Sequence, residues 1–337
     1  MLLLWFALWG LLWGVYFLLD GFDLGGGILL PFLGKHERDR RNVYGSIGPF
    51  WDGNEVWLVA AGGITFAAFP LAYAVMFSAL YSPLMIILFS LIIRGAAVVL
   101  REHSESAGVK RLWDRLFFLS SLTAAFFFGL TFANLFAGIP INENGVLEGS
   151  LGSFFNGYGI VGGLLFLFLF SFHGALWLAL KSEGDLEDRA ARVAMKLWWG
   201  LVAVAVLFLV MTRVSTELYS NYTSRPGLFV IPAVLVVALL AGGYMAYRRR
   251  FVWAWAAQAV TILYTVFFGL FGIFPALVPS SLHPAYSINL AEAASGPKTL
   301  KIMLAVVIVF IPIVVIYQSW VYHIFKGKIK EEDGYGY

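Results

Sequence analysis

The sequence predicts an all-helical integral membrane protein. Its 337 residues are 60% hydrophobic and only 13% charged, whereas soluble proteins carry roughly 25% charged residues. Apolar runs long enough to cross the roughly 30 Å hydrocarbon core of a bilayer recur along the whole chain. The absence of cysteine excludes disulfides, thiolate metal sites and cysteine nucleophiles, and five histidines leave little for metal binding.

Nine apolar runs of about 20 residues predict nine transmembrane helices. They cover residues 2–22, 49–70, 73–100, 116–138, 158–180, 194–214, 228–247, 251–276 and 299–325. The connections between these runs are short, and none has the composition of a separate soluble domain. We therefore expect one membrane domain across residues 1–337.

The distribution of basic residues predicts the orientation of these spans, because lysine and arginine concentrate in cytoplasmic loops. Of the 23 basic residues, 18 follow the first, third, fifth, seventh and ninth spans. Four lie on the opposite side, and Arg94 lies inside a span. We expect the N-terminus outside, the C-terminus in the cytoplasm, and the chain in a cytoplasmic membrane.

The run from residue 48 to 58 carries unusual polar chemistry at the start of an apolar span. In a helix, Asp52 and Glu55 are three residues apart and share a face. An amide and two indoles lie in the same run: Trp51, Asn54 and Trp57. First-turn acids can simply complement the helix dipole at the interface. Carboxylates inside a membrane are costly and often carry protons, however, and this dense polar run favours such a function.

The polar residues inside the spans gather in the expected cytoplasmic half. They are Asp20, Asp23, Asp52, Glu55, Arg94 and His173. Each unpaired acid at mid-membrane costs roughly 2.5–3.5 kcal/mol on insertion scales. Since Arg94 can neutralise one carboxylate but not four, the others must pair, take up protons or line water. Acids that open on the cytoplasm are typical of a proton-uptake path.

Two further features of the spans have competing interpretations. The glycines that follow Asp23 let the chain turn at the end of the first span, or let helices approach closely. His173 could bind haem or relay protons, but a lone histidine in an apolar helix is more often a hydrogen-bonded structural residue.

Four motifs within residues 16–100 carry a family resemblance. They are Asp20-Gly-Phe-Asp23-Leu-Gly-Gly-Gly, Gly48-Pro-Phe-Trp51-Asp52-Gly-Asn54-Glu55-Val-Trp57-Leu, Phe66-Ala-Ala-Phe-Pro70 and Arg94-Gly. With these motifs the chain resembles subunit II of the cytochrome bd quinol oxidases. The Trp-Asp-Gly-Asn-x-Val-Trp run is the most specific of them, and the second half of the chain agrees through its architecture.

The resemblance implies two four-helix bundles, residues 1–138 and 139–276, followed by a peripheral ninth helix and a cytoplasmic tail within 277–337. It implies a heterodimer in which subunit I holds two haem b and one haem d, oxidises quinol on the outer side and reduces dioxygen to water. No cofactor, metal or nucleic acid is expected on this chain. A quinone bound between its bundles and a small single-helix third subunit stay open. The source would be bacterial or archaeal.

The resemblance also implies residue roles. Asp52 matches the aspartate of the family's proton path, Asp23 matches the aspartate of the Asp-Gly-Phe-Asp motif, and Arg94 matches its arginine. Our hypothesis is that Asp52 accepts cytoplasmic protons, with Asp20 and Asp23 near the point of uptake and Arg94 tuning their proton affinity. An ion-coupled transporter is an alternative, since glycine-broken spans with acids also suit transport. A purely structural scaffold for the haem subunit is another.

Overall fold

The computed structural model describes residues 1–329 and is almost entirely helical. The helices are α1 (Leu2–Leu33), α2 (Glu37–Ile47), α3 (Trp51–Ala68), α4 (Pro70–Ala79), α5 (Tyr81–Glu102), α6 (Ala107–Ala137), α7 (Gly157–Lys181), α8 (Gly184–Ser215), α9 (Leu218–Ser224), α10 (Val230–Tyr247), α11 (Phe251–Ile273), α12 (Leu290–Ala293) and α13 (Pro297–Ile324). Three 3-10 turns are η1 (Leu151–Phe154), η2 (Pro226–Phe229) and η3 (Pro284–Tyr286). Strands β1 (Ala276–Val278) and β2 (Ile288–Asn289) pair antiparallel.

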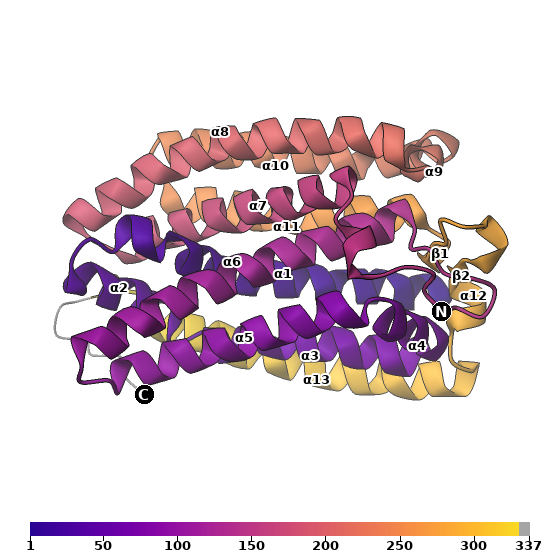
Figure 1. Cartoon of the computed structure of the whole chain (residues 1–337), viewed down its shortest axis with the longest axis horizontal. Helices are drawn as coiled ribbons and strands as arrows, with labels where there is room; N and C mark the ends of the chain where they lie inside the picture. Colours follow the sequence, from indigo (N-terminus) through magenta and orange to yellow (C-terminus); the bar gives the residue numbers. More distant parts are fainter. Residues whose placement is uncertain (330–337) are drawn as a thin grey trace.

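The long helices run side by side along the longest axis of the molecule (Figure 1). One end carries α2, and we call it the α2 end. The opposite end carries the N-terminus, the two strands and the short helices α9 and α12 (Figure 1). At this opposite end the loops after α6 and α11 join, because the Ile139 N–H donates to the Pro279 carbonyl at 2.9 Å.

Eight helices of the described chain are long and apolar enough to cross a membrane, which confirms the predicted all-helical membrane fold. They are α1, α5, α6, α7, α8, η2 with α10, α11 and α13. Helix α3 corresponds to the expected span 49–70 and lies against α1 and α13. It falls outside the set of eight because the polar residues of its first two turns lower its mean hydropathy.

The expected end of the first span at residue 22 is wrong. Helix α1 continues to Leu33 and contacts α3, α6, α7 and α11. The glycines after Asp23 permit this packing rather than ending the helix. A Cβ added at Gly25 would overlap the carbonyl oxygen of Phe170 on α7, and one added at Gly27 would overlap Ser121 on α6. These contacts support close helix approach as the role of the glycines.

Other boundaries also differ from the predicted spans. The expected span 73–100 is divided at Leu80 into α4 and α5. Helices α6 and α8 begin at Ala107 and Gly184, well before residues 116 and 194. A helix satisfies its own backbone hydrogen bonds in water as well as in lipid, so these helices extend past their apolar segments. Helix α2 was not predicted, because most of its residues are charged or polar and only three of its buried residues are apolar: Val43, Tyr44 and Ile47.

Helix α13 is peripheral, and Leu300 is the one fully buried residue assigned to it. The chain just after the C-terminal end of α13 is attached to α7. Lys181 Nζ donates to the carbonyls of Phe325 and Gly327, and the Ile329 N–H donates to the Lys181 carbonyl at 2.9 Å. Of the expected cytoplasmic tail, residues 326–337, the part from 330 to 337 lies outside the described residues.

The close packing of α1 on α7 predicts the effect of one added methyl group. Gly25→Ala should destabilise the folded protein by about 1–3 kcal/mol, because the new Cβ overlaps backbone that cannot rotate away. The matched control is Gly108→Ala, since an added Cβ there meets only Ser106 Oγ at 3.6 Å. The thermal unfolding midpoints of the two purified variants test this, and equal midpoints would contradict it.

Candidate functional site

A buried arginine joins three helices. Arg94 on α5 is 1% exposed. One of its terminal nitrogens lies 2.7 Å from Asp20 Oδ1 on α1, and the other lies 2.5 Å from Glu55 Oε1 on α3. Asp20 Oδ2 accepts a further hydrogen bond of 3.0 Å from the Tyr16 hydroxyl, one turn earlier on α1. Arg94 therefore ties α1, α3 and α5 together through charge-assisted contacts.

A second polar group is centred on Asn54. Its Nδ2 donates to Asp23 Oδ2 at 2.7 Å, which joins α3 to α1. Its Oδ1 accepts from Gln318 Nε2 at 2.9 Å and from the Tyr322 hydroxyl at 3.0 Å, both on α13. The Trp57 indole completes the group, donating to Gln318 Oε1 at 2.6 Å. The peripheral helix α13 is thus bound to the core by polar side chains.

The two groups form one electrostatic unit. Asp23 follows Asp20 by three residues on α1, so the two carboxyl groups lie on one face of the helix. Asp20 and Asp23 are fully buried, and the Glu55 side chain is 28% exposed. One guanidinium thus pairs with two of the three carboxyl groups, and the third lies beside them without a cation of its own. With all of them ionised the unit would carry a net charge of −2 inside the protein, which is unfavourable, so the arrangement is suited to binding and releasing protons.

Asp52 occupies a different position from the other acids. It is exposed on α3, and its Oδ1 accepts a hydrogen bond of 2.7 Å from the Gly53 N–H. It interacts electrostatically with Glu55. Burial therefore increases from Asp52 through Glu55 to Asp20 and Asp23. Asp20 and Asp23 are therefore the most deeply buried acids of the site, and α1 continues past them to Leu33.

His173 is held among aromatic rings rather than among the acids. Its Nε2 lies 2.9 Å from the Leu18 carbonyl oxygen, and its ring stacks on Trp255 with centroids 5.1 Å apart. These contacts favour the structural interpretation of His173 over haem ligation. Across residues 1–329, no group of three or more His, Cys, Asp or Glu side chains is arranged to hold a metal ion.

Trp51 and Arg94-Gly95 fit together across α3 and α5. A Cβ added at Gly95 would lie 2.8 Å from the Trp51 ring, so the glycine makes room for the indole beside Arg94.

The candidate set from the sequence lacked three members of the site: Tyr16, Gln318 and Tyr322. A four-residue spacing was the available signal, since Tyr16 precedes Asp20 by one turn and Gln318 precedes Tyr322 by one turn.

Comparisons with known proteins agree over nearly the whole chain. The family model for cytochrome bd terminal oxidase subunit II matches residues 1–325. The cytochrome bd ubiquinol oxidase subunit 2 of Bacillus subtilis (strain 168) is 34% identical over 333 residues, which cover 98% of this chain and 97% of that protein. The cytochrome bd-I ubiquinol oxidase subunit 2 of Escherichia coli (strain K12) is 29% identical over 361 residues, covering 98% and 95%.

The fold agrees with a solved structure as well. A chain of the bd oxidase from Geobacillus thermodenitrificans superposes with a TM-score of 0.77 at 17% identity, covering 96% of this chain and 98% of that chain. At that identity the superposition establishes the fold alone. The family model and the Bacillus relative establish the family: this chain belongs to the cytochrome bd terminal oxidase subunit II family.

Proposed function

We propose that this chain is the haem-free subunit of a quinol-oxidising terminal oxidase and supports a haem-bearing subunit I. In that complex electrons pass from quinol to dioxygen, which is reduced to water, and two haem b and one haem d belong to subunit I. The family match over residues 1–325 and the names of the relatives as ubiquinol oxidase subunits support this proposal. This chain would not be catalytic alone.

The proposed topology has nine spans, with the N-terminus outside and the α2 end in the cytoplasm of a bacterial or archaeal cell. Helix α3 is the ninth span beside the eight apolar helices. Residues 1–138 and 139–276 form the two four-helix bundles, and α13 lies outside them. The clustering of basic residues at the α2 end supports this orientation, since 18 of the 23 follow odd-numbered spans.

The second part of the proposal is a proton-uptake path through this chain. The observation that carries it is that one buried guanidinium pairs with two carboxyl groups, while a third buried carboxyl group, Asp23, has no cation in contact within the described residues. Protons enter at the exposed Asp52, pass to Glu55 and reach the buried pair Asp20 and Asp23. Dioxygen reduction consumes protons, so uptake from the cytoplasm combined with quinol oxidation on the outer side separates charge across the membrane.

The contacts assign different parts to the two buried aspartates. Arg94 stays protonated at any physiological pH, and its ion pairs with Asp20 and Glu55 favour their ionised forms, so these two acids would carry a proton only in passing. Asp23 is bound instead by the neutral amide of Asn54. We assign Asp23 as the carboxyl best placed to hold the transferred proton. The transporter alternative is set aside by family membership, while the scaffold alternative is separated from ours by the variants below.

The first test is Asp52→Asn. Quinol-driven oxygen uptake of the purified complex should fall at least about tenfold, because the exposed end of the path loses its carboxyl group. The haem absorption spectrum should be unchanged, since Asp52 is exposed and holds no other helix. Glu183→Gln removes another exposed acid and serves as the control. Normal oxygen uptake by the Asp52 variant would contradict the assignment of Asp52 as the entry of the proton path.

The second test is Asp23→Asn. The amide keeps the shape of the side chain and can still accept from Asn54, but it cannot carry a proton. We expect oxygen uptake to fall at least about tenfold with no loss of thermal stability, since a buried charge is removed. A pure scaffold predicts that both oxygen uptake and stability are retained, so unchanged uptake would favour the scaffold.

The third test asks whether the ion pairs of Arg94 stabilise the complex, apart from any role in proton transfer. Arg94→Gln leaves Asp20 and Glu55 without their cation and should destabilise the complex by about 3–5 kcal/mol. Combining Arg94→Gln with Asp20→Asn should restore part of the lost thermal stability, because one unpaired carboxylate is removed. Arg213→Gln, an exposed arginine at the opposite end, is the control. If Arg94→Gln has the same thermal unfolding midpoint as the wild type, the ion pairs do not hold the three helices together.

A further inference from the structure

The α2 end contains a half-open cavity that the proposed function does not use. It lies between the last turn of α1, the helix α2 and the first turns of α6, and has a volume of about 210 Å³. Its lining combines three arginines and one aspartate with apolar side chains. The residues that matter here are Leu30, Arg40, Arg111, Asp114, Arg115 and Phe118.

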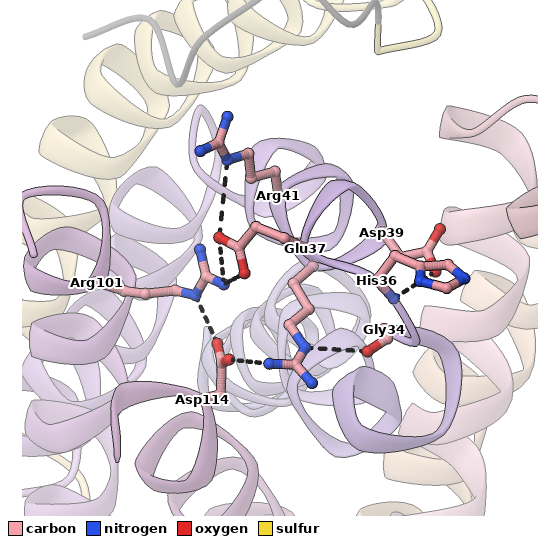
Figure 2. Close-up of polar contacts among 8 residues, drawn as sticks. Gly34, His36, Glu37, Asp39, Arg41, Arg101 and Asp114 are labelled. Atoms are coloured by element: carbon pink, nitrogen blue, oxygen red, sulfur yellow. Dashed lines mark hydrogen bonds and ion pairs between the residues drawn. The ribbon is translucent and has the colours of Figure 1, made fainter. Parts of the chain in front are cut away.

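The acid of the cavity is already fully engaged. Asp114 Oδ1 accepts from Arg101 Nε at 2.6 Å (Figure 2). Asp114 Oδ2 lies 3.2 Å from a terminal nitrogen of Arg40. Glu37, on the far side of this network, faces Arg101 at 3.1 Å and Arg41 at 3.8 Å (Figure 2). Each oxygen of Asp114 is therefore paired with Arg101 or Arg40, and among the described residues Asp114 forms no ion pair with Arg111 or Arg115.

Arg111 and Arg115 are the arginines that remain. They lie four residues apart on α6, so they share a face and repel each other. Both are exposed, and neither forms an ion pair within residues 1–329. The charged lining of three arginines and one aspartate leaves a net charge of +2. An anion between Arg111 and Arg115 would relieve their repulsion.

The apolar part of the lining suits a hydrocarbon chain. Leu30 and Phe118 line it. Phe32, which is 63% exposed, packs edge-on against Phe118 with ring centroids 6.3 Å apart. Leu119 on α6 is also exposed. A free phosphate would use the arginines alone, whereas a phospholipid would cover both the charged and the apolar part of the lining.

We propose that this cavity binds an anionic phospholipid from the membrane leaflet at the α2 end. Its phosphate would lie between Arg111 and Arg115, and an acyl chain would lie along Leu30, Phe118 and Phe32. Basic pockets at the cytoplasmic ends of membrane helices are suited to anionic headgroups. The geometry makes Arg40 part of the rigid wall, since Asp114 and the Gly34 carbonyl hold it. The site is independent of the proton path.

The test uses the complete complex, delipidated in neutral detergent. It is titrated with phosphatidylglycerol, phosphatidylcholine or inorganic phosphate, and native mass spectrometry counts the bound molecules. The Arg111→Gln/Arg115→Gln variant should lose one phosphatidylglycerol per complex, with affinity at that site weakened roughly 30-fold. Phosphatidylcholine, which has no net charge, should bind this site more weakly than phosphatidylglycerol.

The control variant, Arg192→Gln/Arg248→Gln, removes two exposed arginines of α8 and the α10 end and should keep the lipid. Equal lipid counts in the wild type and the Arg111/Arg115 variant would overturn the proposal. Saturation by inorganic phosphate without phosphatidylglycerol binding would also overturn it, in favour of a free anion. If the double variant loses the haem absorption of the complex, the single variant Arg115→Gln provides the same comparison.

Discussion

The burial of one guanidinium among three carboxyl groups is the constraint on which the first half of this chain depends. Neither Arg94 nor the acids would be tolerated alone inside a membrane protein, because desolvation of each charge costs several kcal/mol. Together they offset much of this cost, but only if α1, α3 and α5 meet at one depth. The ion pairs therefore determine which faces of these helices turn inward.

The packing around this unit follows from the absence of a hydrophobic driving force between helices in lipid. Small residues and polar contacts hold helices together there. Gly25 and Gly27 bring α1 against α7 and α6, and Gly95 admits the Trp51 ring beside Arg94. Helix α13 buries little of its surface and is attached instead through Gln318, through Tyr322 and through the Lys181 contacts.

The sequence predicts much of this arrangement, and its failures have physical reasons. Hydropathy and the basic residues identify the helices, and the position of Arg94 and the acids along the chain indicates a polar site. The predicted end of α1 was too early because the aspartates and glycines lower the local hydropathy. In the structure Gly25 and Gly27 continue the helix and allow close packing. The exposure of Asp52 and the burial of Asp23 could not be predicted, since they depend on how α1 and α3 are rotated against each other.

The orientation of the Asn54 amide follows from a single donor outside the acid group. The Trp57 indole N–H can only donate, so the Gln318 carbonyl oxygen must face it and the Gln318 amide nitrogen must point away. That nitrogen donates to Asn54 Oδ1, which leaves Asn54 Nδ2 to face Asp23. Asn54 thus presents a donor to Asp23 whether or not Asp23 holds a proton. The contacts of α13 therefore fix the surroundings of the carboxyl that we assign as the proton carrier.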